Sequence, residues 1–245
     1  MNHNGAMRTN RNLIEFDGAV VRRHPLTSWD RADLPNIAVR HETARDLGLP
    51  VPRVLAVHCD HLVLERAAGT PLMETTLSAA AQARLGAALA DVLRILATVT
   101  DWPLDGTPWH RLWERLHSSA GVESTARAAL LARSITPTLT HGDLSGGNLL
   151  VSPNGDLCAV IDWDGATLAD HAQDFRALCE NVPAGVAQSI WRHTEHAEVL
   201  QSRADVYLAT WAVQDQLWRQ GQHPWITSDD CQASPKGEGE GFSGC

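Results

Sequence analysis

The alternation of hydrophobic and polar positions predicts a strand-rich first region followed by a longer helical one. Residues 12–23 (NLIEFDGAVVRR) predict two short strands around Asp17-Gly18, a dipeptide typical of hairpin turns. Residues 34–47 have apolar positions at helical spacing, and Gly48 is placed to cap the end of that helix. Two β-rich runs, VPRVLAVHC and HLVLER, follow, separated by a short polar corner. We therefore expect a β-β-α-β-β arrangement, a small and mostly antiparallel sheet with one helix.

After residue 71 the pattern becomes helical. Leucine and valine recur at helical intervals over residues 78–98, and Ser78 is placed to cap the first turn. Trp109 and Trp113, four residues apart, indicate a second helix. Residues 170–219 again show a helical pattern.

Two predicted strands interrupt this helical region. The runs HGDLSGGNLL (residues 141–150) and LCAVID (residues 157–162) are joined by a turn signal at residues 153–155. At the C-terminal end, residues 227–245 are rich in Gly, Ser and acidic residues and predict a disordered tail.

Composition narrows the class of protein. The chain has 245 residues, of which 44% are hydrophobic, enough for one domain of two lobes or two small domains. It contains no run of about 18 apolar residues, and its polar N-terminus lacks the apolar segment of a secretory signal. The five cysteines are odd in number, widely spread and form no CxxC pair. We therefore expect a cytoplasmic protein that does not contact membranes.

Charge is distributed unevenly along the chain. The net charge of -9 argues against a nucleic-acid partner, because phosphate backbones require basic surfaces. Residues 1–66 carry 9 Arg and 8 acidic residues, whereas residues 67–245 carry 11 basic and 21 acidic residues. The acidic second region favours a cationic ligand, although ordinary solubility also explains such charge.

The strongest chemical motif is HGDLSGGN at residues 141–148, followed fourteen residues after Asn148 by Asp162-Trp163-Asp164. Phosphoryl transfer needs a carboxylate to orient the attacking hydroxyl and accept its proton. It also needs oxygen ligands for the magnesium ions that neutralise the phosphates. The loop offers the carboxylate and one ligand, and the strand-turn-strand unit returns a second carboxylate to the same cleft. Two unrelated acidic turns are the alternative interpretation.

These segments resemble the catalytic loop and the metal-binding segment of the aminoglycoside phosphotransferase and choline kinase families, which share the protein-kinase-like fold. The resemblance implies an α+β, two-lobed chain. Its small β-rich lobe would comprise residues 1–66, abbreviated at the start, and its larger, mainly helical lobe residues 67–226. The resemblance also implies Asp143 as the catalytic carboxylate, Asn148 as a magnesium ligand and Asp162 as the second, stronger magnesium ligand.

The same resemblance implies supporting roles around the loop. His141 would brace the loop by hydrogen bonds, although a general base is the alternative role for this histidine. Asp174 would cap or anchor the loop rather than react. Asp164 would contact metal or substrate, or else be an exposed acid of the turn.

In the first region, the resemblance concerns the nucleotide. Glu42 resembles the helix glutamate that pairs with a phosphate-gripping lysine, and backbone groups from Glu65 to Ala67 would pair with adenine. The chain has one lysine, in its C-terminal tail, so the phosphate-gripping cation must be Arg22 or Arg23. Adjacent side chains of a strand point to opposite faces, and Arg22 fits the family pattern better.

The residues that select the acceptor carry no motif. The resembling families build the acceptor pocket in the last helices, although solvated helix faces are the default interpretation of the polar residues there. The candidates are Asp164, Glu195, Glu198, Asp215 and Trp218. The corner His58-Cys59-Asp60-His61 has metal-binding residue types, but its close spacing favours a solvated turn over a four-ligand site.

We therefore expect a kinase, dependent on ATP or GTP and on Mg²⁺, that phosphorylates a hydroxyl of a small cationic acceptor. An aminoglycoside-like antibiotic is the foremost acceptor. The same motifs serve metabolite kinases acting on choline, homoserine or a sugar, and the missing lysine leaves open a catalytically inactive nucleotide-binding module. We expect a monomer.

Overall fold

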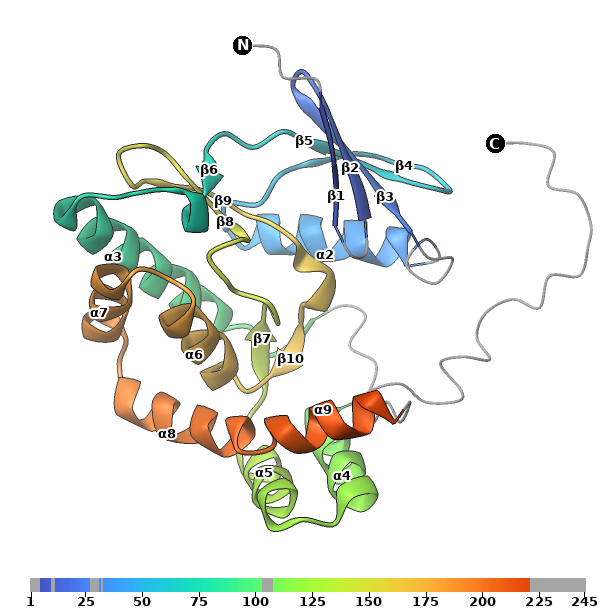
Figure 1. Ribbon diagram of the computed structural model, residues 1–245, viewed down its shortest axis with the longest axis vertical. Helices are drawn as coiled ribbons and strands as arrows, with labels where there is room; N and C mark the ends of the chain where they lie inside the picture. The colour runs from blue at the N-terminus through green and yellow to red at the C-terminus, as the bar shows by residue number, and fades with distance from the viewer. Residues whose placement is uncertain (1–4, 10–11, 27–30, 32, 103–107, 221–245) are drawn as a thin grey trace, which may run out of the picture.

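A five-stranded antiparallel sheet forms the N-terminal part of the computed structural model (Figure 1). The structure describes residues 5–9, 12–26, 31, 33–102 and 108–220. The spatial order of the strands is β1-β2-β3-β5-β4. Their bounds are Gly5–Arg8 (β1), Asn12–Asp17 (β2), Val20–Pro25 (β3), Val54–Val57 (β4) and Leu62–Glu65 (β5). The four predicted strands are present, and β1 is an additional edge strand paired with β2.

Helix α2 (Leu34–Asp46) packs against one face of this sheet (Figure 1). Its buried positions recur at helical spacing, as expected for a helix with one apolar face. The core shared by helix and sheet consists of Leu34, Ile37, Ala38, Leu62 and Leu64. Gly48 then adopts a φ of 82°, a left-handed conformation that ends the helix and turns the chain toward β4.

Two small antiparallel sheets follow, one in the order β6-β8-β9 and one pairing β7 with β10. Their bounds are Thr70–Pro71 (β6), Thr138–Thr140 (β7), Leu149–Val151 (β8), Leu157–Val160 (β9) and Thr167–Ala169 (β10). The prediction of a strand over residues 141–150 is wrong for residues 141–148, which form a loop. Backbone groups of that loop bond to side chains instead of a neighbouring strand.

Helices make up most of the remainder. They are α3 (Ala79–Leu96), α4 (Trp109–Ala120), α5 (Glu123–Ser134), α6 (Ala172–Glu180), α7 (Ala184–His193), α8 (Ala197–Leu208) and α9 (Trp211–Arg219), with 3₁₀ turns η1 (Leu72–Glu74) and η2 (Trp163–Gly165). The Ser78 side chain accepts a hydrogen bond from the Ala81 N–H, which confirms the predicted cap. Helix α5 was not indicated by periodicity, because its alanine-rich sequence has few large apolar residues.

The C-terminal part has two hydrophobic clusters. The larger one lies among α3, α6, α7 and the β8–β9 hairpin. In it, Gly86 lets α3 approach α7, since a Cβ at this position would lie 2.4 Å from the Ser189 Cβ. The smaller cluster contains Trp109 and Trp113, with ring centroids 5.4 Å apart, and joins α4, α5, α8 and α9.

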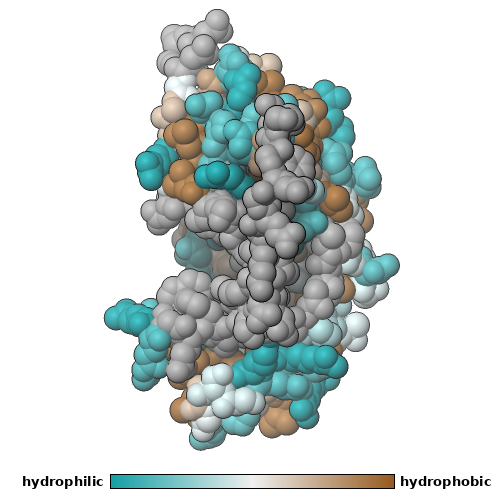
Figure 2. Space-filling view, turned by 90° about the vertical axis from the view of Figure 1, so that its right-hand side faces the viewer, coloured by the Kyte–Doolittle hydropathy of each residue, from teal (hydrophilic) through white to brown (hydrophobic). Residues whose placement is uncertain are grey.

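On the face of the molecule in Figure 2, hydrophilic and hydrophobic surface residues are interspersed. Within the described residues, none of the helices combines the length and the apolar character that crossing a bilayer requires. The tail predicted to be disordered, residues 227–245, lies outside the described part of the chain.

Candidate active site

The loop at residues 141–148 is anchored by a buried carboxylate. Asp174, in the first turn of α6, is 1% exposed and accepts hydrogen bonds from the backbone N–H groups of His141 (2.5 Å) and Gly142 (3.1 Å). Burial raises the pKa of Asp174 to about 6, and the two amide donors act in the opposite direction. Asp174 thus ties the start of the loop to α6.

His141 braces the same loop from within. Its Nε2–H donates to the Ile161 carbonyl (3.0 Å), and its Nδ1 accepts from the Asp143 N–H (3.2 Å). This pairing fixes a neutral ring, and burial lowers the pKa of His141 to about 4. The His141 and Trp163 rings form an edge-to-face pair with centroids 4.7 Å apart. With both nitrogens engaged, His141 positions the loop and is not placed to deprotonate an acceptor.

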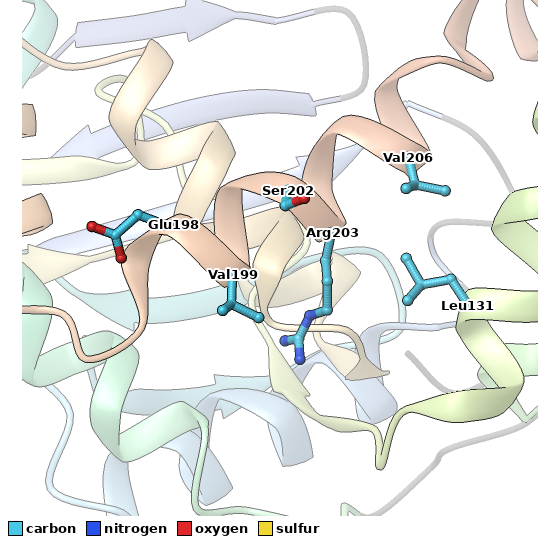
Figure 3. A pocket seen from close by; sticks show the side chains of 6 residues that line it. All are labelled: Leu131, Glu198, Val199, Ser202, Arg203 and Val206. Carbon is cyan, nitrogen blue, oxygen red and sulfur yellow. The ribbon is translucent and has the colours of Figure 1, made fainter.

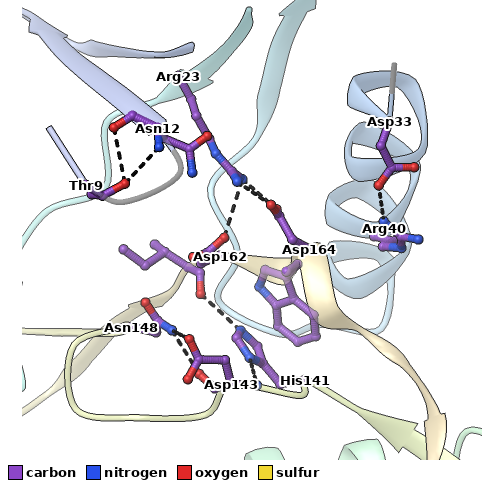
Figure 4. Close-up of polar contacts among 12 residues, drawn as sticks. Thr9, Asn12, Arg23, Asp33, Arg40, His141, Asp143, Asn148, Asp162 and Asp164 are labelled. Carbon is purple, nitrogen blue, oxygen red and sulfur yellow. Dashed lines mark hydrogen bonds and ion pairs between the residues drawn. The ribbon is translucent and has the colours of Figure 1, made fainter. Parts of the chain in front are cut away.

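Asp143 and Asn148 meet at the exposed end of the loop (Figure 4). The Asn148 Nδ2 donates to both the backbone carbonyl and the Oδ2 of Asp143, each at 2.9 Å. These bonds fix the amide orientation, so the Asn148 Oδ1 is the atom that can bind a metal ion. The Asp143 carboxylate keeps an oxygen that can accept the proton of a hydroxyl.

Asp162 follows β9, and its carboxylate is directed toward Arg23 (Figure 4). Its backbone has φ 66° and ψ 60°, a left-handed conformation uncommon for residues other than glycine. The Ile161 N–H donates to the Asn148 carbonyl at 2.9 Å, which joins the two segments beside their functional side chains. Gly142 has φ 83°, and a Cβ there would lie 2.7 Å from the Gly165 carbonyl oxygen. Glycine is therefore required where the loop contacts the turn.

Asp162 lies beside other carboxylates, an electrostatic environment that favours a bound cation. Burial and the neighbouring Asp164 carboxylate raise the pKa of Asp162 to about 6, with a smaller contribution from Asp143, while Arg23 lowers it. The buried Oδ1 of Asp162 has no hydrogen-bond partner among the described residues and lies 3.4 Å from the Arg23 guanidinium. Carboxylate and amide oxygens are the ligands Mg²⁺ prefers, so Asp162 and Asn148 fit that ion.

Arg23, from β3, connects the N-terminal sheet to this turn. Its guanidinium forms a two-pronged ion pair with the Asp164 carboxylate, with Nη1 at 2.5 Å from Oδ1 and Nη2 bonded to Oδ2. The two side chains are only 8% and 13% exposed. Such a paired fork is both strong and geometrically specific.

Arg22, the predicted phosphate-gripping residue, points elsewhere. Its Nη1 lies 2.9 Å from Asp17 Oδ2, and its side chain is 36% exposed. Val21 packs into the core beneath α2, and because strand side chains alternate, Arg23 shares that face and Arg22 does not. The structure thus brings Arg23, and not Arg22, to the candidate site.

Glu42 also differs from its predicted partnership. Its Oε1 accepts a hydrogen bond from the Val54 N–H (2.9 Å), and its Oε2 lies 3.8 Å from Arg45, so it ties α2 to β4. The side chain of α2 that points into the protein is that of His41, which is 1% exposed and lies close enough to Asp164 to interact with its charge. Burial lowers the pKa of His41 to about 4. The helical spacing of buried residues would have identified position 41.

The segment predicted to contact adenine begins at the end of β5. The Glu65 N–H donates to the Arg53 carbonyl (2.9 Å), and the Arg66 N–H donates to the Ala19 carbonyl (2.8 Å). These two amides are therefore engaged in the sheet. In the described part of the chain, Ala67 takes no part in such backbone pairs and is the better placed of the two predicted contacts.

The acceptor candidates do not converge on the loop. Glu198 lines a cavity of about 420 Å³ between α5 and α8, together with Leu131, Val199, Ser202, Arg203 and Val206 (Figure 3). Asp143, Asn148 and Asp162 do not line this cavity.

The remaining acceptor candidates are dispersed. Glu195 is exposed beyond α7, and Asp215 pairs with Arg219 on α9 at 2.8 Å. Asp164 is engaged by Arg23. The Trp218 side chain lies outside what the structure describes.

Comparisons with known proteins identify the family and the fold of the chain. The model of a family described as the phosphotransferase enzyme family matches residues 14–217. The ADP-bound aminoglycoside phosphotransferase APH(2'')-Ib superposes with a TM-score of 0.69 at 15% identity, covering 93% of this chain and 88% of the other. The GDP and kanamycin complex of APH(2'')-IIia gives 0.62 at 17% identity, covering 89% of each chain.

An antibiotic phosphotransferase of another kind is also similar. The macrolide 2'-phosphotransferase MphH from Brachybacterium faecium gives a TM-score of 0.64 at 17% identity, covering 93% of this chain and 88% of the other. No curated protein matches the chain. At these identities the structures establish the fold, while the family match spans most of the sequence. The predicted family is confirmed, and the chain belongs to the phosphotransferase enzyme family.

Proposed function

We propose that this protein transfers the γ-phosphate of ATP or GTP to a hydroxyl of a small cationic molecule, most specifically an aminoglycoside-like antibiotic. One observation carries the proposal. Asn148 is bonded to Asp143, Asp162 lies close enough for the Asp143 charge to raise its pKa, and the Arg23 guanidinium lies 3.4 Å from Asp162. This combination provides a proton acceptor, oxygen ligands and a cation within one site, as phosphoryl transfer requires.

Each side chain then has a distinct role. Asp143 orients the acceptor hydroxyl and takes its proton as the oxygen attacks the γ-phosphorus. The bond from the γ-phosphorus to the β–γ bridging oxygen breaks, and the nucleoside diphosphate leaves. Asn148 Oδ1 and the Asp162 carboxylate would hold Mg²⁺, which would neutralise the phosphate oxygens. Arg23, fixed by Asp164, presents its guanidinium toward the phosphates from the sheet side. His141 and Asp174 keep Asp143 in place without reacting.

In the proposed enzyme these roles are divided between two lobes. Residues 1–66 would supply Arg23 and the nucleotide contacts, including backbone groups at Ala67 just beyond the boundary. Residues 67–226 would supply the carboxylates and the acceptor-binding surface. The Arg23–Asp164 ion pair, between residues 141 positions apart, supports a nucleotide site at the junction of the two parts.

The choice of acceptor has two supports. The second region carries 21 acidic against 11 basic residues, which favours a cationic ligand. Similar structures include complexes with kanamycin and gentamicin, both bound to aminoglycoside-modifying relatives, and a macrolide phosphotransferase. Because the acceptor candidates do not converge on the loop, charge and fold support this choice rather than a formed pocket.

The test is an acceptor panel with ATP and GTP, each with and without Mg²⁺. The panel contains aminoglycosides, macrolides, choline, homoserine and sugars, and phosphorylated product is identified by mass spectrometry. We expect magnesium-dependent phosphorylation of an aminoglycoside. Turnover of choline or homoserine alone would replace the antibiotic by a metabolite. Nucleotide binding that ignores magnesium, without any product, would instead indicate an inactive nucleotide-binding module.

A further inference from the structure

A second group of metal-binding side chains lies at a corner of the N-terminal sheet. The corner joins β4 to β5 and is closed by a hydrogen bond from the His58 N–H to the His61 carbonyl (2.9 Å). Arg23 of β3 is paired with Leu62 of β5. The next residue of β3, His24, therefore lies beside His61 and joins the corner from a distant part of the sequence.

The side chains at this corner are in direct contact. The rings of His24 and His61 stack with centroids 4.8 Å apart, and those of His58 and His61 stack at 4.3 Å. Each of two histidines also has a carboxylate partner. Asp60 Oδ1 lies 2.7 Å from His61 Nδ1, and Glu15 Oε2 lies 3.3 Å from His24 Nε2.

We propose that His24, Asp60 and His61 form a binding site for a divalent transition-metal ion of the zinc class. One ligand atom from each residue lies within 4.8 Å of the other two. Tetrahedral zinc with bonds of about 2.0 Å needs ligand atoms about 3.3 Å apart. Asp60 is exposed and the two histidines are half-buried, so side-chain rotation can close the remaining gap.

The ligand set also selects the kind of metal. Two imidazoles and one carboxylate favour Zn²⁺, Ni²⁺ or Co²⁺ over Mg²⁺, which prefers oxygen ligands alone. Glu15 would orient the His24 ring, as carboxylates commonly do for histidine ligands. His58 or water would complete the coordination.

The contribution of His24 removes the main objection to a metal ion at this corner. His58, Asp60 and His61 lie too close in sequence to surround an ion by themselves. His24 approaches from another strand, so the ligands come from two separate segments. On β3, His24 and Arg23 point to opposite faces, so the bound metal would join β3 to the corner without entering the phosphoryl-transfer site.

The test uses the full-length protein after treatment with a chelator, titrated with Zn²⁺ by calorimetry and with Co²⁺ by visible absorption. We expect one site that loses about 100-fold or more in affinity in His24→Gln and in His61→Gln, and about tenfold in Glu15→Gln. Two matched controls should bind as the parent does: His110→Gln, a histidine on α4, and Cys59→Ser, the cysteine within the corner. Melting temperatures of the metal-free variants show whether each one folds.

Three results would overturn the site. These are no binding by the parent, unchanged binding in the His24→Gln/His61→Gln double variant, and loss in Cys59→Ser with retention in His24→Gln. If a histidine variant does not fold, the exposed Asp60→Asn variant decides, and unchanged affinity there counts against the site. None of these outcomes depends on phosphotransferase activity, so the metal site and the proposed enzyme can fail separately.

Discussion

The loop at residues 141–148 and the turn after β9 hold the two carboxylates of the candidate site in different ways. The loop that carries Asp143 is fixed within the C-terminal part, by Asp174 and by the ring of His141. The turn that carries Asp162 is instead connected to the N-terminal sheet, through Arg23 and Asp164.

This difference separates two functions of the site. The anchors of the loop at Asp174 and His141 fix the backbone beside Asp143 from within the C-terminal part. A turn held by an arginine of the sheet couples the carboxylate proposed to bind metal to the position of the part proposed to bind the nucleotide. Substitutions in the loop should therefore change the rate of phosphoryl transfer and the order of the loop itself. Substitutions in the turn should change nucleotide affinity and weaken the contact between the N-terminal sheet and the C-terminal part.

The largest effect is expected for Asp143→Ala. Loss of the proton acceptor should lower kcat by about 10²–10⁴-fold, because general-base catalysis contributes that much. Nucleotide affinity should remain close to that of the parent, since Asp143 is exposed and its proposed role is to accept the acceptor's proton rather than to bind metal or phosphate. Kinetics with the best acceptor and a nucleotide-binding titration measure the two quantities. Parental turnover in this variant would contradict the role of Asp143.

The next effect distinguishes Arg23 from its neighbour. Arg23→Ala breaks the buried ion pair with Asp164 by removing one partner, which should cost about 3–5 kcal/mol of unfolding free energy and weaken nucleotide binding. Arg22→Ala removes an exposed ion pair, worth about 0–1 kcal/mol. Urea denaturation and nucleotide titration of both variants provide the comparison. Equal unfolding free energies and equal nucleotide affinities in the two variants would show that the Arg23–Asp164 ion pair does not connect the sheet to the C-terminal part.

A smaller effect is expected for Asp174→Asn. An asparagine offers one acceptor oxygen, so one of the His141 and Gly142 amides would lose its partner, at a cost of about 1 kcal/mol. The specific measurement is hydrogen exchange, in which these two amides should exchange faster while the sheet amides are unchanged. A drop in kcat without a change in nucleotide affinity should accompany it. Unchanged protection of both amides would rule out the anchoring role.

The smallest effect concerns pH. The pKa of Asp162 is raised to about 6, so its carboxylate becomes protonated as the pH falls below that value. Since Mg²⁺ binds the ionised form, magnesium-nucleotide affinity should fall about tenfold per pH unit below about 6. Affinity titrations between pH 5 and 7.5 test this. Asp162→Asn should bind weakly at every pH, and a parental pH profile in that variant would reject the assignment.

Much of the fold could be predicted because its signals are local. The Asp17-Gly18 hairpin, the helix from Leu34 and the Ser78 cap each depend on a few consecutive residues, and all three are present. The strand predicted at residues 141–148 is a loop, because amide donors there find the Asp174 carboxylate 33 residues away. A window of neighbouring residues contains no information about that partner.

The candidate site shows the same limit. The motif identified Asp143, Asn148 and Asp162 by residue type and spacing, but the choice between Arg22 and Arg23 depended on which strand face meets α2. The inward-facing helix residue is His41 rather than Glu42, because α2 presents the stripe of buried positions that contains residue 41.

The sequence by itself determined which chemical groups are available and in what order: the loop carboxylate, the amide, the second carboxylate and the local elements that carry them. Only the tertiary structure decided which side chains interact: Arg23 pairs with Asp164, and the His24 ring stacks on that of His61. The physical reason is the distance along the chain over which each kind of interaction acts. Turn and helix propensities act over a few residues, whereas contacts between distant segments are selected by the packing of whole strands and helices.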